Sequence, residues 1–276
     1  MLELIDRALA EDVGEGDITT TAVVEPGARA RARIEQKAAG VPAGLRVAEQ
    51  VFERVDPDVR WHAHADEGEW REPGLLAELA GSAASILAAE RVALNFLGRL
   101  SGIATLTARY VEAVDGTGVR ILDTRKTTPG MRTLEKEAVR AGGGVSHREG
   151  LFDAILVKEN HATLAGGVAV AARLAMEAAR PGVPVEVECA TIEDVVGALD
   201  AGVPRLLLDN MLPVELGAAV ELTGGRAELE ASGGITLESV RAVAGTGVDF
   251  ISVGALTHSA PALDLSLLLE PGDYTL

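Results

Sequence analysis

Charged and polar residues that could carry chemistry recur directly after short apolar stretches of this 276-residue chain. Stretches of this kind are typical of buried parallel strands, and in a barrel the reacting groups gather where the strands end. We therefore expect one site, built from the residues at the ends of six stretches. These residues are Asp123-Thr124-Arg125-Lys126, Lys158-Glu159-Asn160-His161, Glu188, Asp209-Asn210, Ser232-Gly233-Gly234, and Ser252 with Gly254.

The loop after the first stretch is strongly basic in a chain that is acidic as a whole. Seven Lys or Arg residues lie from Arg120 to Arg148, whereas the formal net charge of the chain is −17. Arginine binds carboxylate or phosphate through two parallel hydrogen bonds, and lysine acts as a mobile point charge. Arg125, Lys126, His147 and Arg148 stand among loop-forming residues. We expect them to bind a ligand with several negative charges; the alternative is a solvated face paired with glutamates.

Three further groups are expected at the same barrel mouth. Lys158 ends an apolar strand, which places its ammonium in the mouth rather than on the surface. Glu188 and Asp209 end consecutive strands, and such carboxylates hold magnesium or stabilise developing positive charge. A simple pair of rim carboxylates is the alternative. Glu186 alternates with Glu188, and we expect only one of these two to be catalytic.

Two glycine-containing segments could bind phosphate. Ser232-Gly233-Gly234 opens a helix after a strand, where backbone N–H groups can bind an anion. Ser252 and Gly254 lie one strand later, so the two segments match the phosphate site formed by the last two loops of a barrel. Cys189 is interpreted as a small buried thiol rather than a nucleophile.

The elements that must position these residues alternate between strand and helix from residue 119 onward. Strands are expected at 119–122, 154–157, 185–187, 205–208, 227–230 and 250–253, and helices at 134–141, 164–179, 192–201, 213–222 and 237–244. This alternation predicts parallel strands, and the short repeat favours a barrel that six strands leave open or incomplete. The first part of the chain predicts a small α+β domain, with helices at 2–10 and 81–100 and a strand at 29–36.

Composition and charge exclude several classes of function. The net charge of −17 argues against nucleic-acid binding through a basic face and against docking to anionic lipid. The one cysteine cannot form an intramolecular disulfide, and the longest apolar runs are too short to span a bilayer. No secretory hydrophobic segment follows Met1. We expect a cytoplasmic protein with no nucleic-acid or membrane partner.

Six motifs in their order along the chain resemble the quinolinate phosphoribosyltransferase family. They are Glu11-Asp12 with Gly16-Asp17, Glu90-Arg91 to Gly102-Ile103-Ala104-Thr105, the run from Asp123 to Gly130, Gly142-Gly143-Gly144 with His147-Arg148, the run from Val157 to His161, and the run from Leu208 to Met211. The resemblance covers essentially the whole chain. It implies an α/β fold with an N-terminal α/β sandwich domain at 1–105 and an open α/β (TIM-like) barrel at 106–261. A tail at about 262–276 would pack back on the first domain.

The resemblance also implies a reaction. Phosphoribosyl pyrophosphate would transfer its phosphoribosyl group to quinolinate, with decarboxylation, giving nicotinate mononucleotide, CO2 and pyrophosphate in de novo NAD biosynthesis. Quinolinate would bind Arg91, Thr124, Arg125, Lys126, His147, Arg148 and Lys158. Phosphoribosyl pyrophosphate would bind Glu188, Asp209, Ser232, Gly233, Gly234, Ser252, Gly254 and His258. Lys126, Lys158, Glu188 and Asp209 would be catalytic, with Mg2+ near the two carboxylates and held mostly through the pyrophosphate. Lys126 or Lys158 would protonate the decarboxylated ring.

Family membership would further imply a head-to-tail homodimer, with a hexamer as the larger alternative. Arg91 would then reach the active site of the neighbouring subunit. Two other functions stay open. A paralogous phosphoribosyltransferase could use another acceptor, either nicotinate or a substrate associated with molybdate-transport loci, although two carboxylate-binding arginines favour a dicarboxylate. A non-catalytic barrel could bind phosphorylated metabolites, but it would not need Glu188 and Asp209 beside a lysine.

Overall fold

The computed structural model describes residues 1–272, and the chain divides into two compact units. The first unit comprises residues 1–108, 128–143 and the chain from residue 259 onward, and the second comprises residues 109–127 and 144–258. Residues 273–276, the end of the predicted tail at 262–276, lie outside the described part. We keep 1–105 and 106–261 as the proposed domain limits.

The first unit is a four-stranded antiparallel sheet with helices. Its elements are α1 (Leu2–Val13), α2 (Ile18–Val23), β1 (Arg29–Gln36), α3 (Leu45–Val55), β2 (Arg60–Ala63), β3 (Gly74–Ser82), most of α4 (Ala83–Ala113), α5 (Arg132–Ala141) and β10 (Leu265–Pro271). The strand order is β10-β1-β3-β2. Strand β1 has the predicted bounds, and because strand side chains alternate between faces, its Ala30, Ala32 and Ile34 are buried between partly exposed arginines.

The second unit is an open barrel of parallel strands. Its elements are β4 (Arg120–Leu122), β5 (Ile155–Val157), α6 (Glu159–Ala165), α7 (Val168–Ala178), β6 (Val185–Cys189), α8 (Ile192–Asp200), β7 (Arg205–Asp209), α9 (Pro213–Thr223), β8 (Glu228–Ser232), α10 (Val240–Ala244), β9 (Phe250–Ser252) and α11 (Ala255–His258). The order β4-β9-β8-β7-β6-β5 joins the first strand to the last and leaves β4 and β5 as edges. The predicted α/β fold with an open barrel is confirmed.

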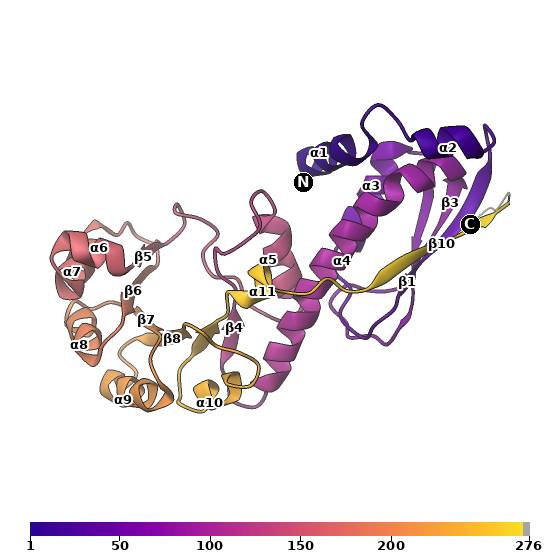
Figure 1. Cartoon of the computed structure of the whole chain (residues 1–276). Coiled ribbons are helices and arrows are strands. Elements are labelled where there is room, and N and C mark those ends of the chain that lie inside the picture. The colour runs from indigo at the N-terminus through magenta and orange to yellow at the C-terminus, as the bar shows by residue number, and fades with distance from the viewer. Residues whose placement is uncertain (273–276) are drawn as a thin grey trace. The chain divides into compact units, whose positions relative to one another are not determined.

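Helices cover the outer side of this sheet, as Figure 1 shows for α7, α8, α9 and α10. The single helix expected at 164–179 is wrong, because Gly166 and Gly167 both take positive φ values, of 92° and 119°, and separate α6 from α7. The last predicted helix, at 237–244, is shorter than expected, since α10 begins at Val240. Among residues 1–272, no helix is long and apolar enough to cross a membrane.

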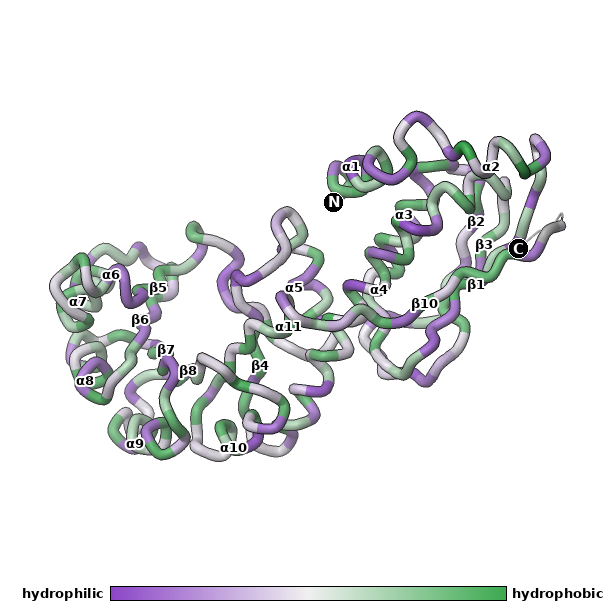
Figure 2. The backbone as a smooth tube through the Cα atoms, in the orientation of Figure 1, coloured by the Kyte–Doolittle hydropathy of each residue, from purple (hydrophilic) through white to green (hydrophobic). Residues whose placement is uncertain are grey.

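The register of the sheet explains why polar groups meet at its carboxyl end. Asp209 pairs with Ser232, and Ser232 pairs with Ser252, so three strand ends lie side by side. Residues two positions apart in a strand face the same side, which directs Glu186 and Glu188 to one face of β6. Hydrophilic stretches next to the hydrophobic strands can be followed in Figure 2.

Candidate active site

A cavity of about 340 Å3 lies at the carboxyl ends of the barrel strands. Nine of the residues predicted for the site line it: Thr124, Arg125, Lys126, His147, Arg148, Lys158, Asp209, Ser232 and Ser252. Leu156, Leu207 and Glu230 complete the lining. The size is that of a pocket for a small molecule, and the lining is mostly polar and charged.

Two arginines form a cationic wall of this cavity. The Arg148 guanidinium donates a hydrogen bond to the Ala154 carbonyl at 3.2 Å. Burial, and after it the nearby charge of Arg125, lowers the pKa of Arg148, although Asp153 and Glu186 act in the opposite direction. The positive charges of Arg125 and Arg148 repel each other, and an anion bound between the two guanidinium groups would offset that repulsion. The wall is therefore suited to a ligand with negative charge.

Lys158 and Glu188 meet on neighbouring strand ends. The Lys158 ammonium lies 2.5 Å from Glu188 Oε2, and the backbone N–H of Glu159 donates to Glu188 Oε1 at 3.2 Å. Glu188 is thus fixed by the loop after β5, although it belongs to β6. Glu188 thus takes part in an ion pair at the rim, as the alternative interpretation of the two carboxylates allowed, and Lys158 of this pair lines the cavity.

The end of β7 carries unusual backbone geometry. Asn210 has a φ of 56°, the one positive value at a non-glycine position among residues 1–272. Its side chain donates to Asp209 Oδ2 at 2.7 Å, and its backbone N–H donates to the Ser232 carbonyl at 2.8 Å. Gly233 has a φ of 102°, and a Cβ there would lie 2.2 Å from Asn210 Oδ1. Such strained positions are maintained where the surrounding structure requires them.

The loop after β9 approaches the loop after β4. A Cβ on Gly254 would lie 3.0 Å from Lys126 Cδ and 3.3 Å from the His258 ring, so glycine allows this close approach. The Thr257 hydroxyl donates to the Lys126 carbonyl at 2.8 Å. Gly234 has a φ of 60° with open space around it. Of the glycines expected to bind phosphate, Gly234 is therefore surrounded by open space, and Gly254 lies where the backbone passes close to Lys126 and His258.

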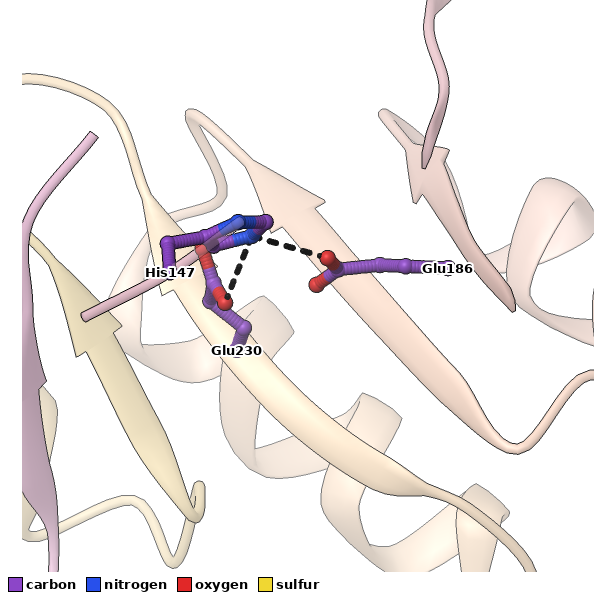
Figure 3. Close-up of side chains that lie close together, drawn as sticks. All are labelled: His147, Glu186 and Glu230. Atoms are coloured by element: carbon purple, nitrogen blue, oxygen red, sulfur yellow. Dashed lines mark ion pairs between the residues drawn. The ribbon is translucent and has the colours of Figure 1, made fainter. Parts of the chain in front are cut away.

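Behind the cavity lies a buried charge network that the sequence analysis missed. His147 Nε2 is 2.9 Å from Glu186 Oε2 and 3.5 Å from Glu230 Oε2, as Figure 3 shows. Arg205 lies 3.3 Å from Glu186 through Nε and 2.6 Å from Glu230 through Nη2. Glu230 is fully buried, and the side chain of Glu186 is 6 % exposed. We name these four residues the floor network.

The carboxyl groups of the floor network titrate differently. Burial, and next the charge of Glu186, raises the pKa of Glu230 to about 7. Burial also acts to raise the pKa of Glu186, but His147 and Arg205 outweigh it and hold that pKa below its ordinary value. The signal in the sequence was a glutamate between two apolar residues in each of two strands: Glu186 between Val185 and Val187, and Glu230 between Leu229 and Ala231. A buried acid in such a strand needs a partner.

Arg91 and Cys189 are not among the residues that line the cavity. Arg91 belongs to α4 within the first unit, and its side chain is 63 % exposed, with Glu90 Oε1 at 3.8 Å. Cys189 is fully buried, and burial raises the pKa of its thiol to about 12, with smaller contributions from Asp194 and Glu188. A thiol in that state is a weak nucleophile, which agrees with the structural interpretation of Cys189.

Glu188 and Asp209 have the donor chemistry that magnesium prefers, namely carboxylate oxygens. Lys158 and the Glu159 N–H engage Glu188, while Asn210 engages Asp209. The carboxylate oxygens of Glu188 and Asp209 would fit a divalent cation. Among residues 1–272, His147, Glu186 and Glu230 form the one cluster whose possible ligand atoms lie within 4.8 Å of one another. The Arg205 guanidinium already supplies positive charge to that cluster.

Comparisons with known proteins agree with the geometry along the whole chain. The family model "Quinolinate phosphoribosyl transferase, N-terminal domain" matches residues 17–101, and "Quinolinate phosphoribosyl transferase, C-terminal domain" matches residues 103–268. A probable nicotinate-nucleotide pyrophosphorylase [carboxylating] of Bacillus subtilis is 43 % identical over 96 % of this chain and 92 % of the relative. The chloroplastic nicotinate-nucleotide pyrophosphorylase [carboxylating] of Arabidopsis thaliana is 42 % identical over 97 % of this chain and 82 % of the relative.

A solved structure leads to the same family. The crystal structure of NadC from Streptococcus pyogenes has a TM-score of 0.93 and 41 % sequence identity, and it covers 98 % of this chain and 96 % of its own. Both family models together span most of the sequence, and the relatives named here match it over 82 % or more of their own length. The chain belongs to the quinolinate phosphoribosyltransferase family.

Proposed function

We propose that this enzyme transfers the phosphoribosyl group of phosphoribosyl pyrophosphate to quinolinate and removes one carboxyl group. The products would be nicotinate mononucleotide, CO2 and pyrophosphate. Family membership supports this reaction, and one observation of the site carries it. Two arginines and two lysines share a single cavity with Asp209, and Glu188 is paired with one of those lysines. The cationic side suits an aromatic dianion, and the carboxylates suit the ribose of a sugar phosphate, on which positive charge develops.

Quinolinate is proposed to bind the cationic side of the cavity. Arg125 and Arg148 would each bind a carboxylate group through paired hydrogen bonds. Thr124, Lys126, His147 and Lys158 would line the ring. The lowered pKa of Arg148, caused by burial and by Arg125, supports this assignment because a bound dianion would offset the repulsion.

Phosphoribosyl pyrophosphate is proposed to bind the opposite side. Ser232, Gly233, Gly234, Ser252, Gly254 and His258 would hold its phosphate, and Glu188 and Asp209 would flank its ribose. When bound near these two carboxylates, Mg2+ would neutralise charge on the departing pyrophosphate. The carboxylates themselves would stabilise the positive charge that develops on the ribose ring as the pyridine nitrogen attacks C1.

Decarboxylation follows from the charge of the alkylated ring. Loss of the 2-carboxylate as CO2 leaves its electron pair on the ring carbon next to the cationic nitrogen, which stabilises it. A proton must then reach that carbon. Lys126 and Lys158 both line the cavity, and either ammonium can supply this proton.

Assembly and location are proposed as the family implies. A homodimer, or a hexamer made of such dimers, would place Arg91 of one subunit at the cavity of the next. The exposed Arg91 side chain supports this role because a guanidinium with one weak partner is available to a ligand. We propose a cytoplasmic enzyme.

A direct assay with three acceptors tests the proposed reaction. The purified chain is incubated with phosphoribosyl pyrophosphate and either quinolinate, nicotinate or no acceptor, each with Mg2+ and with EDTA in its place, and mononucleotide and pyrophosphate are quantified. The proposal expects product from quinolinate only, and product only when Mg2+ is present. Turnover of nicotinate without turnover of quinolinate would instead support a paralogous transferase, and no turnover of any acceptor would support a binding protein.

A further inference from the structure

The floor network has an unbalanced charge that depends on one proton. The backbone N–H of Arg148 donates to His147 Nδ1 at 2.6 Å, so His147 faces the two glutamates through Nε2. The Arg205 guanidinium contacts both carboxyl groups. Two ionised carboxyl groups exceed the single positive charge of Arg205, and one proton bound to a carboxyl group balances it.

This charge lies directly under the proposed acceptor. Glu230 itself lines the cavity, together with Arg125, His147 and Arg148. A negative floor repels a dicarboxylate, whereas a neutral floor does not. The groups that face Glu230 are Glu186 on β6, Arg205 on β7, Ser252 on β9 and His147 on the loop before β5. Of these, Glu186 is held ionised, so Glu230 is the group that can change its charge.

Solvent can reach the floor network from the opposite side. A second cavity, of about 520 Å3, lies at the amino ends of β5, β6, β7 and β8. Its lining includes Glu186, Arg205 and His147, and the first cavity also contacts His147. The network therefore separates two cavities. A proton can enter from the second cavity even when a substrate covers the first.

We propose that Glu230 takes up one proton from solvent when the dicarboxylate binds, and that Glu186 and Arg205 position His147 while this exchange occurs. The proton joins a carboxylate oxygen of Glu230, and it returns to solvent when the anion leaves. Glu230 is thus a positioning residue that sets the charge beneath the acceptor. The inference rests on the proposed function, because it places quinolinate against Arg125 and Arg148.

Calorimetry measures the proton directly. Quinolinate is titrated into the wild-type enzyme at pH 6 and pH 8, each time in Tris and in HEPES, and the dependence of the binding heat on the buffer gives the protons taken up. We expect uptake near zero at pH 6, where Glu230 is already protonated, and approaching one proton per site at pH 8. Glu230→Gln keeps the shape and removes the charge, so its uptake should be near zero at both values. Glu221→Gln, at an exposed position on α9, is the control and should retain wild-type uptake.

The pH dependence of the acceptor KM provides a second readout. Because the binding of quinolinate takes up one proton, its affinity for the wild-type enzyme should fall by up to about tenfold per pH unit above neutrality. In Glu230→Gln the KM should stay flat, which a merely structural role for Glu230 would not produce. If the wild-type enzyme takes up no proton at pH 8, the inference is wrong, and this measurement needs no variant. The inference is also wrong if Glu230→Gln takes up as many protons as the wild-type enzyme.

The two possible failures can be told apart. If Arg148→Ala binds quinolinate as tightly as the wild-type enzyme, the proposed acceptor site is wrong. If Arg148→Ala loses binding while the wild-type enzyme takes up no proton, the acceptor site stands and only the proton exchange fails.

Discussion

Lys158 and Glu188 join two neighbouring strand ends of the barrel, with 2.5 Å between the lysine Nζ and the glutamate Oε2. The lysine lines the cavity, and Glu188 is held by the same loop that follows β5. Lys158 and Glu188, both proposed to be catalytic, therefore depend on each other for position. Removal of either is expected to free the side chain of the other from its position.

The carboxylates should act on the chemical step rather than on acceptor binding. Glu188→Gln and Asp209→Asn are each expected to lower kcat by about 10²-fold or more, because groups that stabilise transition-state charge have effects of that size. The quinolinate Kd should change much less. Steady-state kinetics and calorimetry provide the two quantities. Glu193→Gln, at an exposed position on α8, is the control for a lost surface charge. Unchanged kcat in both site variants would leave Glu188 and Asp209 as ordinary ion-pairing residues.

Arg148→Ala should raise the quinolinate KM while the fold stays intact. Loss of a charge-assisted hydrogen-bond pair costs about 1.5–3 kcal/mol, which corresponds to about 10- to 100-fold in affinity. The matched control is Arg173→Ala, at an exposed arginine of α7 in the same unit. A normal circular dichroism spectrum with lost binding is expected for Arg148→Ala. Retained binding would contradict the carboxylate role.

Gly233→Ala should weaken the binding of phosphoribosyl pyrophosphate. Alanine is strained at a φ of 102°, and its Cβ would overlap Asn210 Oδ1. Strain of this kind costs about 1–3 kcal/mol. Gly225→Ala shares the positive φ, at 76°, but meets open space, so it reports the cost of backbone strain alone. The KM for phosphoribosyl pyrophosphate should rise only in Gly233→Ala. Equal effects of both variants on that KM would contradict a phosphate loop at this position.

Buried Glu230 should make stability fall between about pH 4.5 and pH 7. Its folded pKa of about 7 lies above its ordinary value of 4.5, so the folded protein binds more protons in this range. The stability present below pH 4.5 is lost as the pH rises through 7, by an amount on the order of 3 kcal/mol. Glu230→Gln lacks this loss. Urea unfolding should therefore show the variant gaining stability relative to the wild type from pH 5 to pH 7.5, and a constant difference would contradict the assignment.

A mixture of two inactive variants tests whether Arg91 is shared. Arg91→Ala and Arg148→Ala are unfolded and refolded together. If Arg91 serves the neighbouring subunit, each mixed dimer contains one complete site, and an equal mixture should recover about a quarter of the wild-type sites. If Arg91 serves its own subunit, both sites of every mixed dimer lack one arginine and activity should stay at background.

The sequence predicted the barrel better than the first unit. The six barrel strands, β4 to β9, were predicted as short strands that end at polar or glycine residues, and the structure agrees within about two residues. Strand β3, Gly74–Ser82, was not predicted as an element, since its Leu and Ala content also suits a helix. The pairing of β3 with β1 and β2 determines its conformation, and this is tertiary information.

The mouth of the site was predictable, whereas its floor was not. Strand ends mark the mouth in any parallel barrel, so Lys158 and Asp209 were identified by position alone. Arg205 and Glu230 are 25 residues apart, and their contact depends on which strands become neighbours. Nothing local in the sequence distinguishes a buried Glu230 from a solvated one except the apolar residues beside it.

An isotope label in one carboxyl group of quinolinate tests the central claim most directly. Quinolinate carrying ¹³C in its 2-carboxylate is incubated with the wild-type enzyme, phosphoribosyl pyrophosphate and Mg2+, and both labelled CO2 and nicotinate mononucleotide are quantified by mass spectrometry. One labelled CO2 per mononucleotide, with no label left in the mononucleotide, is the predicted result. A mononucleotide that retains the label, or turnover of nicotinate but not of quinolinate, would contradict a single cavity that performs both transfer and decarboxylation.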